Sequence, residues 1–149
     1  MTDEFYHKDI FGAVVDINLG AVEETGDKQL FDKKGREFNI FALTDALGAR
    51  NKKDAWILYQ KALSAGLSAE EVFFKIVWQV KSLLIASKTK NVGETDMKVF
   101  PYNKAKSFLE NFKPGELEKL SEDLVIGYTL SRRGEGEVET LVEKILLKL

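Results

Sequence analysis

The 149-residue chain contains no cysteine, one histidine and two prolines. The absence of cysteine excludes disulfides, thiolate nucleophiles and cysteine-ligated metal sites, and it fits a reducing compartment. The single histidine, His7, excludes HExxH and other multi-histidine metal sites, and it leaves the serines without a nearby activating base. Composition therefore removes much of the chemistry on which enzymes depend.

Long apolar runs and phosphate-binding loops are also absent. No apolar run approaches the roughly 20 residues needed to span a bilayer, and the acidic start MTDEFYHKDIF is unlike a signal peptide. Neither GxxxxGK[ST] nor a GxGxxG after a strand occurs. The sequence thus predicts a soluble cytoplasmic protein that is not an enzyme, with no catalytic residue, cofactor, metal, membrane contact or small-molecule substrate.

The charge is distributed unevenly, although the formal net charge is only −2. Residues 1–38 carry nine acids and five bases, residues 50–113 carry six acids and twelve bases, and residues 114–149 carry eight acids and five bases. A basic middle can face an acidic partner or nucleic acid, although many such lysines simply form the solvated faces of helices.

The chain divides into two parts at residue 38. Residues 1–38 form an N-terminal arm, in which residues 9–24 (DIFGAVVDINLGAVEE) place β-branched residues between glycines. That pattern is typical of short β-strands. Residues 39–149 show helical periodicity throughout. The predicted fold is therefore mainly α, a bundle of about six helices with a short arm.

Helix boundary signals recur along residues 39–149. Asn39 and Asn51 are candidate N-caps, and Ser68 with Glu71 forms a capping box. Gly48 and Gly66 suit helix C-termini because glycine tolerates a left-handed conformation. The helices predicted from these signals are 40–47, one after Asn51, 69–90, one opening at Pro101, one from Pro114–Gly115 to about residue 133, and 138–149.

The helix predicted at 69–90 is apolar on more than one face. Its first stripe includes Val72, Ile76 and Leu83, and its second consists of Phe74, Trp78 and Ile85. Such a helix is either central in a bundle or covered by a partner. Tryptophan is common among interface anchors, so Trp78 fits either interpretation.

The order of these motifs resembles the C-terminal domain of the delta subunit of bacterial DNA polymerase III, a clamp-loader subunit. The resemblance begins in EFNIFALTDALGARNKKDAWILYQKALSAGLSAEEVFFKIVWQVKSLLIASK and continues through KVFPYNKAKSFLENFKPGELEKL and DLVIGYTLSRRGEGEVETLVEKILLKL. It covers about residues 37–149. The first 36 residues of this chain do not look like the family's small helical lid domain, and the family's clamp-gripping AAA+-like modules have no counterpart in this sequence.

The resemblance implies a non-catalytic role in DNA replication. In that family the C-terminal helical domain is the collar that holds the clamp-loader subunits in a ring. The implied partners are the delta-prime and ATPase subunits. By position in the resemblance, the candidate partner-interface residues are Phe74, Trp78, Lys81, Arg132 and Arg133. The alternative interpretation is that Trp78 lies in the core and that the arginines only stabilise the negative end of a helix.

The alternative function is a DNA-binding helical module that uses the basic 50–113 region. Its candidate nucleic-acid contacts are Lys52, Lys53, Lys104 and Lys106. Binding of this kind is expected to weaken steeply with salt, because phosphate contacts release counterions.

Overall fold

A computed structural model describes residues 30–31 and 37–149, and its described part is mainly helical. The predicted bundle of about six helices is confirmed over these residues. The strand-like stretch predicted at residues 9–24 and His7 lie outside them. The α-helices are α3 (Ile40–Gly48), α4 (Lys52–Ser64), α5 (Ala69–Lys88), α6 (Val99–Phe108), α7 (Glu116–Arg132) and α8 (Val138–Leu147), with short 3₁₀ turns η1 (Val92–Glu94) and η2 (Leu109–Asn111).

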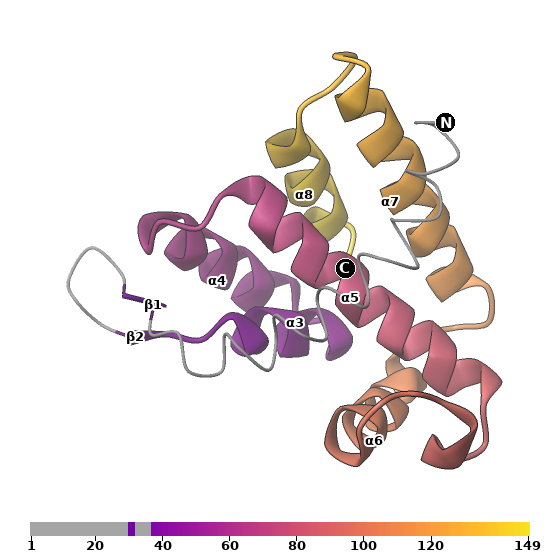
Figure 1. The fold of residues 1–149 in the computed structure, drawn as a ribbon. Helices are drawn as coiled ribbons and strands as arrows, with labels where there is room; N and C mark the ends of the chain where they lie inside the picture. The colour runs from indigo at the N-terminus through magenta and orange to yellow at the C-terminus, as the bar shows by residue number, and fades with distance from the viewer. Residues whose placement is uncertain (1–29, 32–36) are drawn as a thin grey trace.

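Two very short strands precede the helices. β1 (Leu30–Phe31) pairs antiparallel with β2 (Glu37–Phe38), with Leu30 opposite Phe38 and Phe31 opposite Glu37. β2 leads within one residue into α3 (Figure 1). The Phe38 side chain is buried and joins the core of the bundle.

Hydrogen bonds confirm the predicted starts of α3, α4 and α5, whereas α6 begins at Val99, two residues before the predicted start at Pro101. The Asn39 side chain accepts from the Phe41 N–H at 2.9 Å, and Asn51 caps α4 in the same way. At α5, the Ser68 hydroxyl accepts from the Glu71 N–H at 3.1 Å while the Glu71 carboxylate accepts from the Ser68 N–H at 2.7 Å. These local bonds satisfy N–H groups that a helix leaves without an intrahelical partner.

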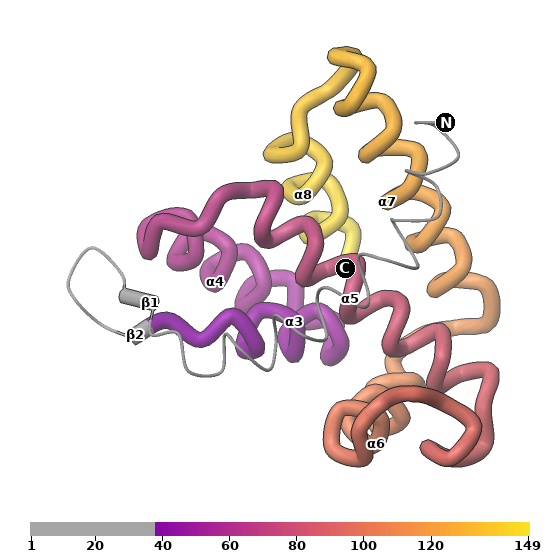
Figure 2. Tube along the Cα trace, in the orientation of Figure 1, coloured from indigo at the N-terminus to yellow at the C-terminus, as the bar shows by residue number. Residues whose placement is uncertain are grey.

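α5 is the central helix of the bundle, which is one of the two arrangements that its two apolar stripes allowed. It contacts each of the other five α-helices. In Figure 1, α3 and α4 lie on one side of it, α7 and α8 on another, and α6 lies near its C-terminal end. The tube in Figure 2 follows the chain from α5 through η1 into α6 and back towards α7. The largest fully buried side chains are Tyr59, Phe73, Leu43, Leu47, Ile76, Leu83, Leu124, Leu146, Val72, Val77, Val80 and Val142.

Gly48 has a different role from the one predicted. It is the last residue of α3, and the left-handed residue that follows is Arg50, with φ of 57°. A Cβ added at Gly48 would lie 2.5 Å from Cδ2 and 2.7 Å from Cγ of Phe108. Glycine is therefore needed here because the Phe108 ring packs directly on the helix backbone.

We predict that Gly48→Ala destabilises the fold by about 1–2 kcal/mol, because overpacking a filled site typically costs about 1–3 kcal/mol and outweighs the helix propensity gained. Urea unfolding measures the change. Gly136→Ala is the matched control, since a Cβ there meets nothing within 4 Å. In a Phe108→Ala background the cost of Gly48→Ala should disappear. A Gly48→Ala protein as stable as wild type would contradict the close packing.

Candidate partner-binding surfaces

A groove lined by aromatic side chains runs between α3, α5 and α6. We call it the aromatic groove. Phe41 comes from α3, Trp78 from α5 and Phe100 from the first turn of α6. The groove has a volume of about 350 Å³, and its other lining residues are Asn39, Thr44, Asp45, Gln79, Pro101, Lys104 and Ala105. Clefts of roughly 300–1,000 Å³ with apolar walls and a few polar groups are typical of binding sites.

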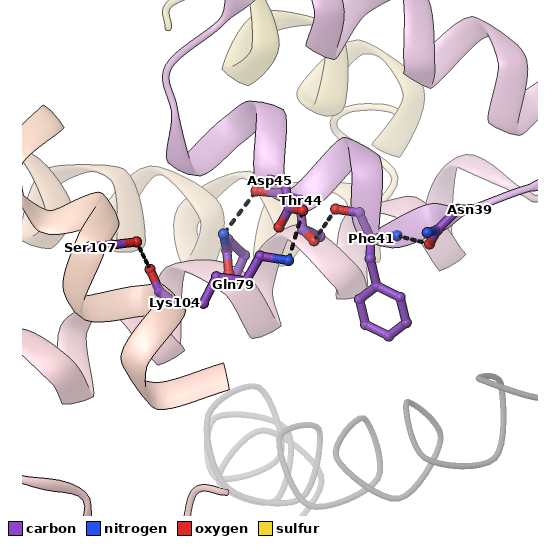
Figure 3. A network of polar contacts seen from close by, with 7 residues as sticks. All are labelled: Asn39, Phe41, Thr44, Asp45, Gln79, Lys104 and Ser107. Atoms are coloured by element: carbon purple, nitrogen blue, oxygen red, sulfur yellow. Dashed lines mark hydrogen bonds and ion pairs between the residues drawn. The ribbon is translucent and has the colours of Figure 1, made fainter. Parts of the chain in front are cut away.

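A polar network holds one side of the aromatic groove (Figure 3). The buried Gln79 amide nitrogen donates to the Thr44 carbonyl at 2.8 Å, which ties α5 to α3. The Lys104 ammonium lies 2.7 Å from the Asp45 carboxylate and joins α6 to α3. The Thr44 hydroxyl donates to the Phe41 carbonyl at 3.0 Å. These groups are therefore satisfied within the chain and fix the positions of the groove walls.

Trp78 is a wall of the aromatic groove and not an exposed anchor. Its side chain is 7% exposed and lies edge-on to Phe41, with ring centroids 6.5 Å apart. The sequence left two interpretations of Trp78 open, a core residue or an interface anchor, and its burial fits the first. Its indole nitrogen is buried and has no hydrogen-bond partner.

Two other predicted interface residues on α5 are also engaged within the chain. Phe74 is half-buried, and its ring packs edge-on to Tyr128 of α7 at 5.6 Å. Phe73 stacks on the same tyrosine at 5.2 Å. Lys81 is half-buried and also interacts with another residue of the chain. Much of the predicted α5 interface is thus used to hold α5 against its neighbours.

The predicted C-terminal interface residues lie beside exposed apolar side chains. Arg132 and Arg133 are exposed at the end of α7, where basic residues favour the negative end of a helix. Ile126 and Leu130 of the same helix are 50% and 38% exposed. Because residues four and three apart share a helix face, Ile126, Leu130 and Arg133 form one surface. We call it the outer face of α7; sequence reasoning did not identify its apolar part.

The four lysines predicted to contact nucleic acid do not share one environment. Lys104 pairs with Asp45, and the Lys106 ammonium donates to the Thr89 carbonyl at 2.5 Å. Lys52 and Lys53 are exposed at the start of α4. Two of the four are therefore committed to contacts inside the chain, which does not favour a shared phosphate-binding surface.

Arg50 links the turn after α3 to the start of α7. Its guanidinium lies 2.6 Å from the Glu116 carboxylate, 3.4 Å from the Asn111 carbonyl and 5.0 Å from the centre of the Phe112 ring. This Arg50 latch lines a second groove of about 450 Å³. The hydrogen bond from Arg50, with another from the Lys113 backbone, lowers the pKa of Glu116. The latch was missed from sequence because its partners lie more than sixty residues away.

In residues 30–31 and 37–149, no group of three or more His, Cys, Asp or Glu residues could hold a metal ion. None of the helices described there is both long and apolar enough to cross a bilayer.

No family model, no curated protein and no solved structure matches the chain.

We predict that Glu116→Gln weakens the fold at neutral pH and that this difference fades in acid. The folded-state pKa of Glu116 is lowered, so its contribution is fully present above the usual glutamate value of about 4.3. It is lost as the pH falls through the lowered pKa. Urea midpoints of both proteins between neutral pH and about pH 3 measure this, with Glu118→Gln in the same helical turn as control. A difference that does not change with pH would contradict the latch.

Proposed function

We propose that residues 39–149 form a non-catalytic assembly domain that joins protein subunits, and that these subunits belong to a clamp loader of DNA replication. The observation that carries the proposal is the outer face of α7. It combines two exposed apolar side chains, Ile126 and Leu130, with the neighbouring Arg133. Apolar anchors beside arginine are typical of the centres of protein interfaces.

The way in which α7 is packed within the bundle favours a role in joining subunits. α7 packs against both α5 and α8, and its buried side is held by Leu117, Leu124 and Tyr128. The close approach of α8 is visible at Gly127, where an added Cβ would lie 2.4 Å from a methyl carbon of Leu141. A rigidly held helix loses little further conformational freedom on binding, so its exposed side chains can contribute more affinity.

The choice of clamp-loader partners rests on the resemblance to the delta-subunit collar. The sequence motifs that carry it coincide with element boundaries of this bundle. Asn39 caps α3, Ser68 and Glu71 cap α5, and Gly115 precedes α7. We therefore propose delta-prime and the ATPase subunits from the same organism as partners.

We predict that the chain binds these subunits and that Ile126→Asp with Leu130→Asp weakens binding by at least about thirtyfold, since a buried interface anchor contributes about 2 kcal/mol or more. Ile57→Asp is the matched control, because Ile57 is 40% exposed on α4 and lies outside this surface. Calorimetry or a pull-down with the purified subunits measures the effect.

Two results would contradict this proposal. The first is an absence of binding at micromolar subunit concentration by a wild-type chain that is folded by circular dichroism. The second is equal weakening by the α7 double variant and by Ile57→Asp, which would place the interface elsewhere or attribute the loss to general destabilisation.

A further inference from the structure

We propose that the outer face of α7 binds the same face of a second copy of this chain, with the two α7 helices antiparallel. Ile126 of each copy then packs against Leu130 of the other. Glu122 of each copy pairs with Arg133 of the other. The paired face is closed to other proteins until one of them displaces the second copy. Only this competition rests on the proposed function, because the pairing itself needs no other subunit.

The outer face of α7 lies on a helix that is held from its other side. α7 forms one edge of the bundle in Figure 1, and both α5 and α8 pack against it. Ile126 and Leu130 are 50% and 38% exposed. Glu122 and Arg133 are exposed as well. At 3.6 residues per turn these four positions lie within roughly 80° around the helix axis. They therefore form one stripe that a second helix can cover.

The order of the side chains along this stripe selects a second copy in the antiparallel direction. At a rise of 1.5 Å per residue, Glu122 precedes Ile126 by about 6 Å along the axis. Arg133 follows Leu130 by about 4.5 Å on the same basis. The acid and the base are thus almost evenly spaced about a point midway between the two apolar residues. A two-fold axis at that point sets each charged end against the end of opposite charge, whereas a parallel arrangement brings like charges together.

Neighbouring charges on α7 are already paired within the chain, unlike the two at the ends of the stripe. The Lys119 ammonium lies 3.0 Å from the Asp123 carboxylate, and the Lys148 ammonium of α8 lies 4.0 Å from the same group. Within the described part of the chain, neither Glu122 nor Arg133 forms an ion pair. Both can therefore pair with a second copy, and two-fold symmetry makes each such contact occur twice.

The size of the outer face of α7 sets the strength of the pairing. α7 has 17 residues, so it is about 25 Å long at 1.5 Å per residue. A contact between two single helices of this length is smaller than a standard interface of roughly 1,600 Å². Small interfaces are typical of reversible association, so we expect a dimer that dissociates on the order of tens of micromolar. A subunit that binds more tightly can displace the second copy.

Sedimentation equilibrium of the full chain, from micromolar to millimolar concentration, measures the pairing. Wild type should show a monomer–dimer equilibrium that weakens as salt is added. Glu122→Arg alone and Arg133→Glu alone should each weaken the dimer at least about fivefold, because each replaces two attractive contacts by two repulsive ones. The two changes combined in one chain should restore wild-type association, which a loss of fold stability could not produce.

Glu118→Arg is the matched control for these charge changes. Glu118 is exposed on the same helix but lies about 80° around the axis from Ile126, outside the stripe. This variant should dimerise like wild type. Urea midpoints of all variants verify that each remains folded.

Single cysteines report the direction of the two helices, because the chain has no cysteine of its own. When Glu122→Cys and Arg133→Cys chains are mixed and oxidised, the disulfide between the two variants should form faster than the disulfide within either one. The dimer locked in this way should bind delta-prime or the ATPase subunits at least about tenfold more weakly than the same protein after reduction.

Five outcomes would overturn the inference. They are a chain that stays monomeric at millimolar concentration, charge variants that dimerise like wild type, equal weakening by Glu118→Arg, faster disulfide formation between two Glu122→Cys chains than in the mixture, and a locked dimer that binds the subunits as well as the reduced protein. A monomeric chain that binds clamp-loader subunits would overturn this inference alone. A chain that dimerises as described but binds no such subunit would support the pairing and contradict the proposed function.

Discussion

The structure depends on the burial of α5. A twenty-residue helix with apolar side chains around most of its circumference cannot be covered by one neighbour, so it is stable in water only when several helices surround it. The other five helices all pack against it. Side chains such as Val72, Phe73, Ile76, Val80 and Leu83 are fully buried as a result. Each of the remaining helices covers a different part of the α5 surface.

Both candidate surfaces follow from how that covering is achieved. α3 and α6 lie near Trp78 and are joined across the groove by Lys104 and Asp45. The space between them is the aromatic groove. α7 covers a different part of α5 through the packing of Tyr128 on Phe73, and this leaves Ile126 and Leu130 facing solvent. A helix that buries one side against α5 presents its opposite side to solvent. Core packing does not explain apolar residues on that exposed side.

The sequence predicts the local features well and the long-range ones poorly. The caps at Asn39 and at Ser68 with Glu71 depend on residues three or fewer apart, so the pattern alone identifies them. The packing of Gly48 on Phe108 and the Arg50–Glu116 pair join residues sixty or more apart. Trp78 shows the same limit, because its second stripe fits burial by α3 as well as burial by a partner. Helix positions were therefore predictable, whereas the grooves between helices required the structure.

The Arg50 latch explains why the aromatic groove has a defined geometry. Arg50 adopts a left-handed conformation that costs a non-glycine residue about 1–2 kcal/mol, and its guanidinium contacts to Glu116 and Asn111 offset that cost. The Asn111 side chain in turn donates to the Gly48 carbonyl at 3.0 Å. The C-terminal end of α3 is thereby tied to η2, the turn that directly follows α6. Since α3 and α6 are the two outer walls of the groove, a contact at their far ends fixes the angle between them. These contacts thus join the far ends of the two helices that carry Phe41 and Phe100.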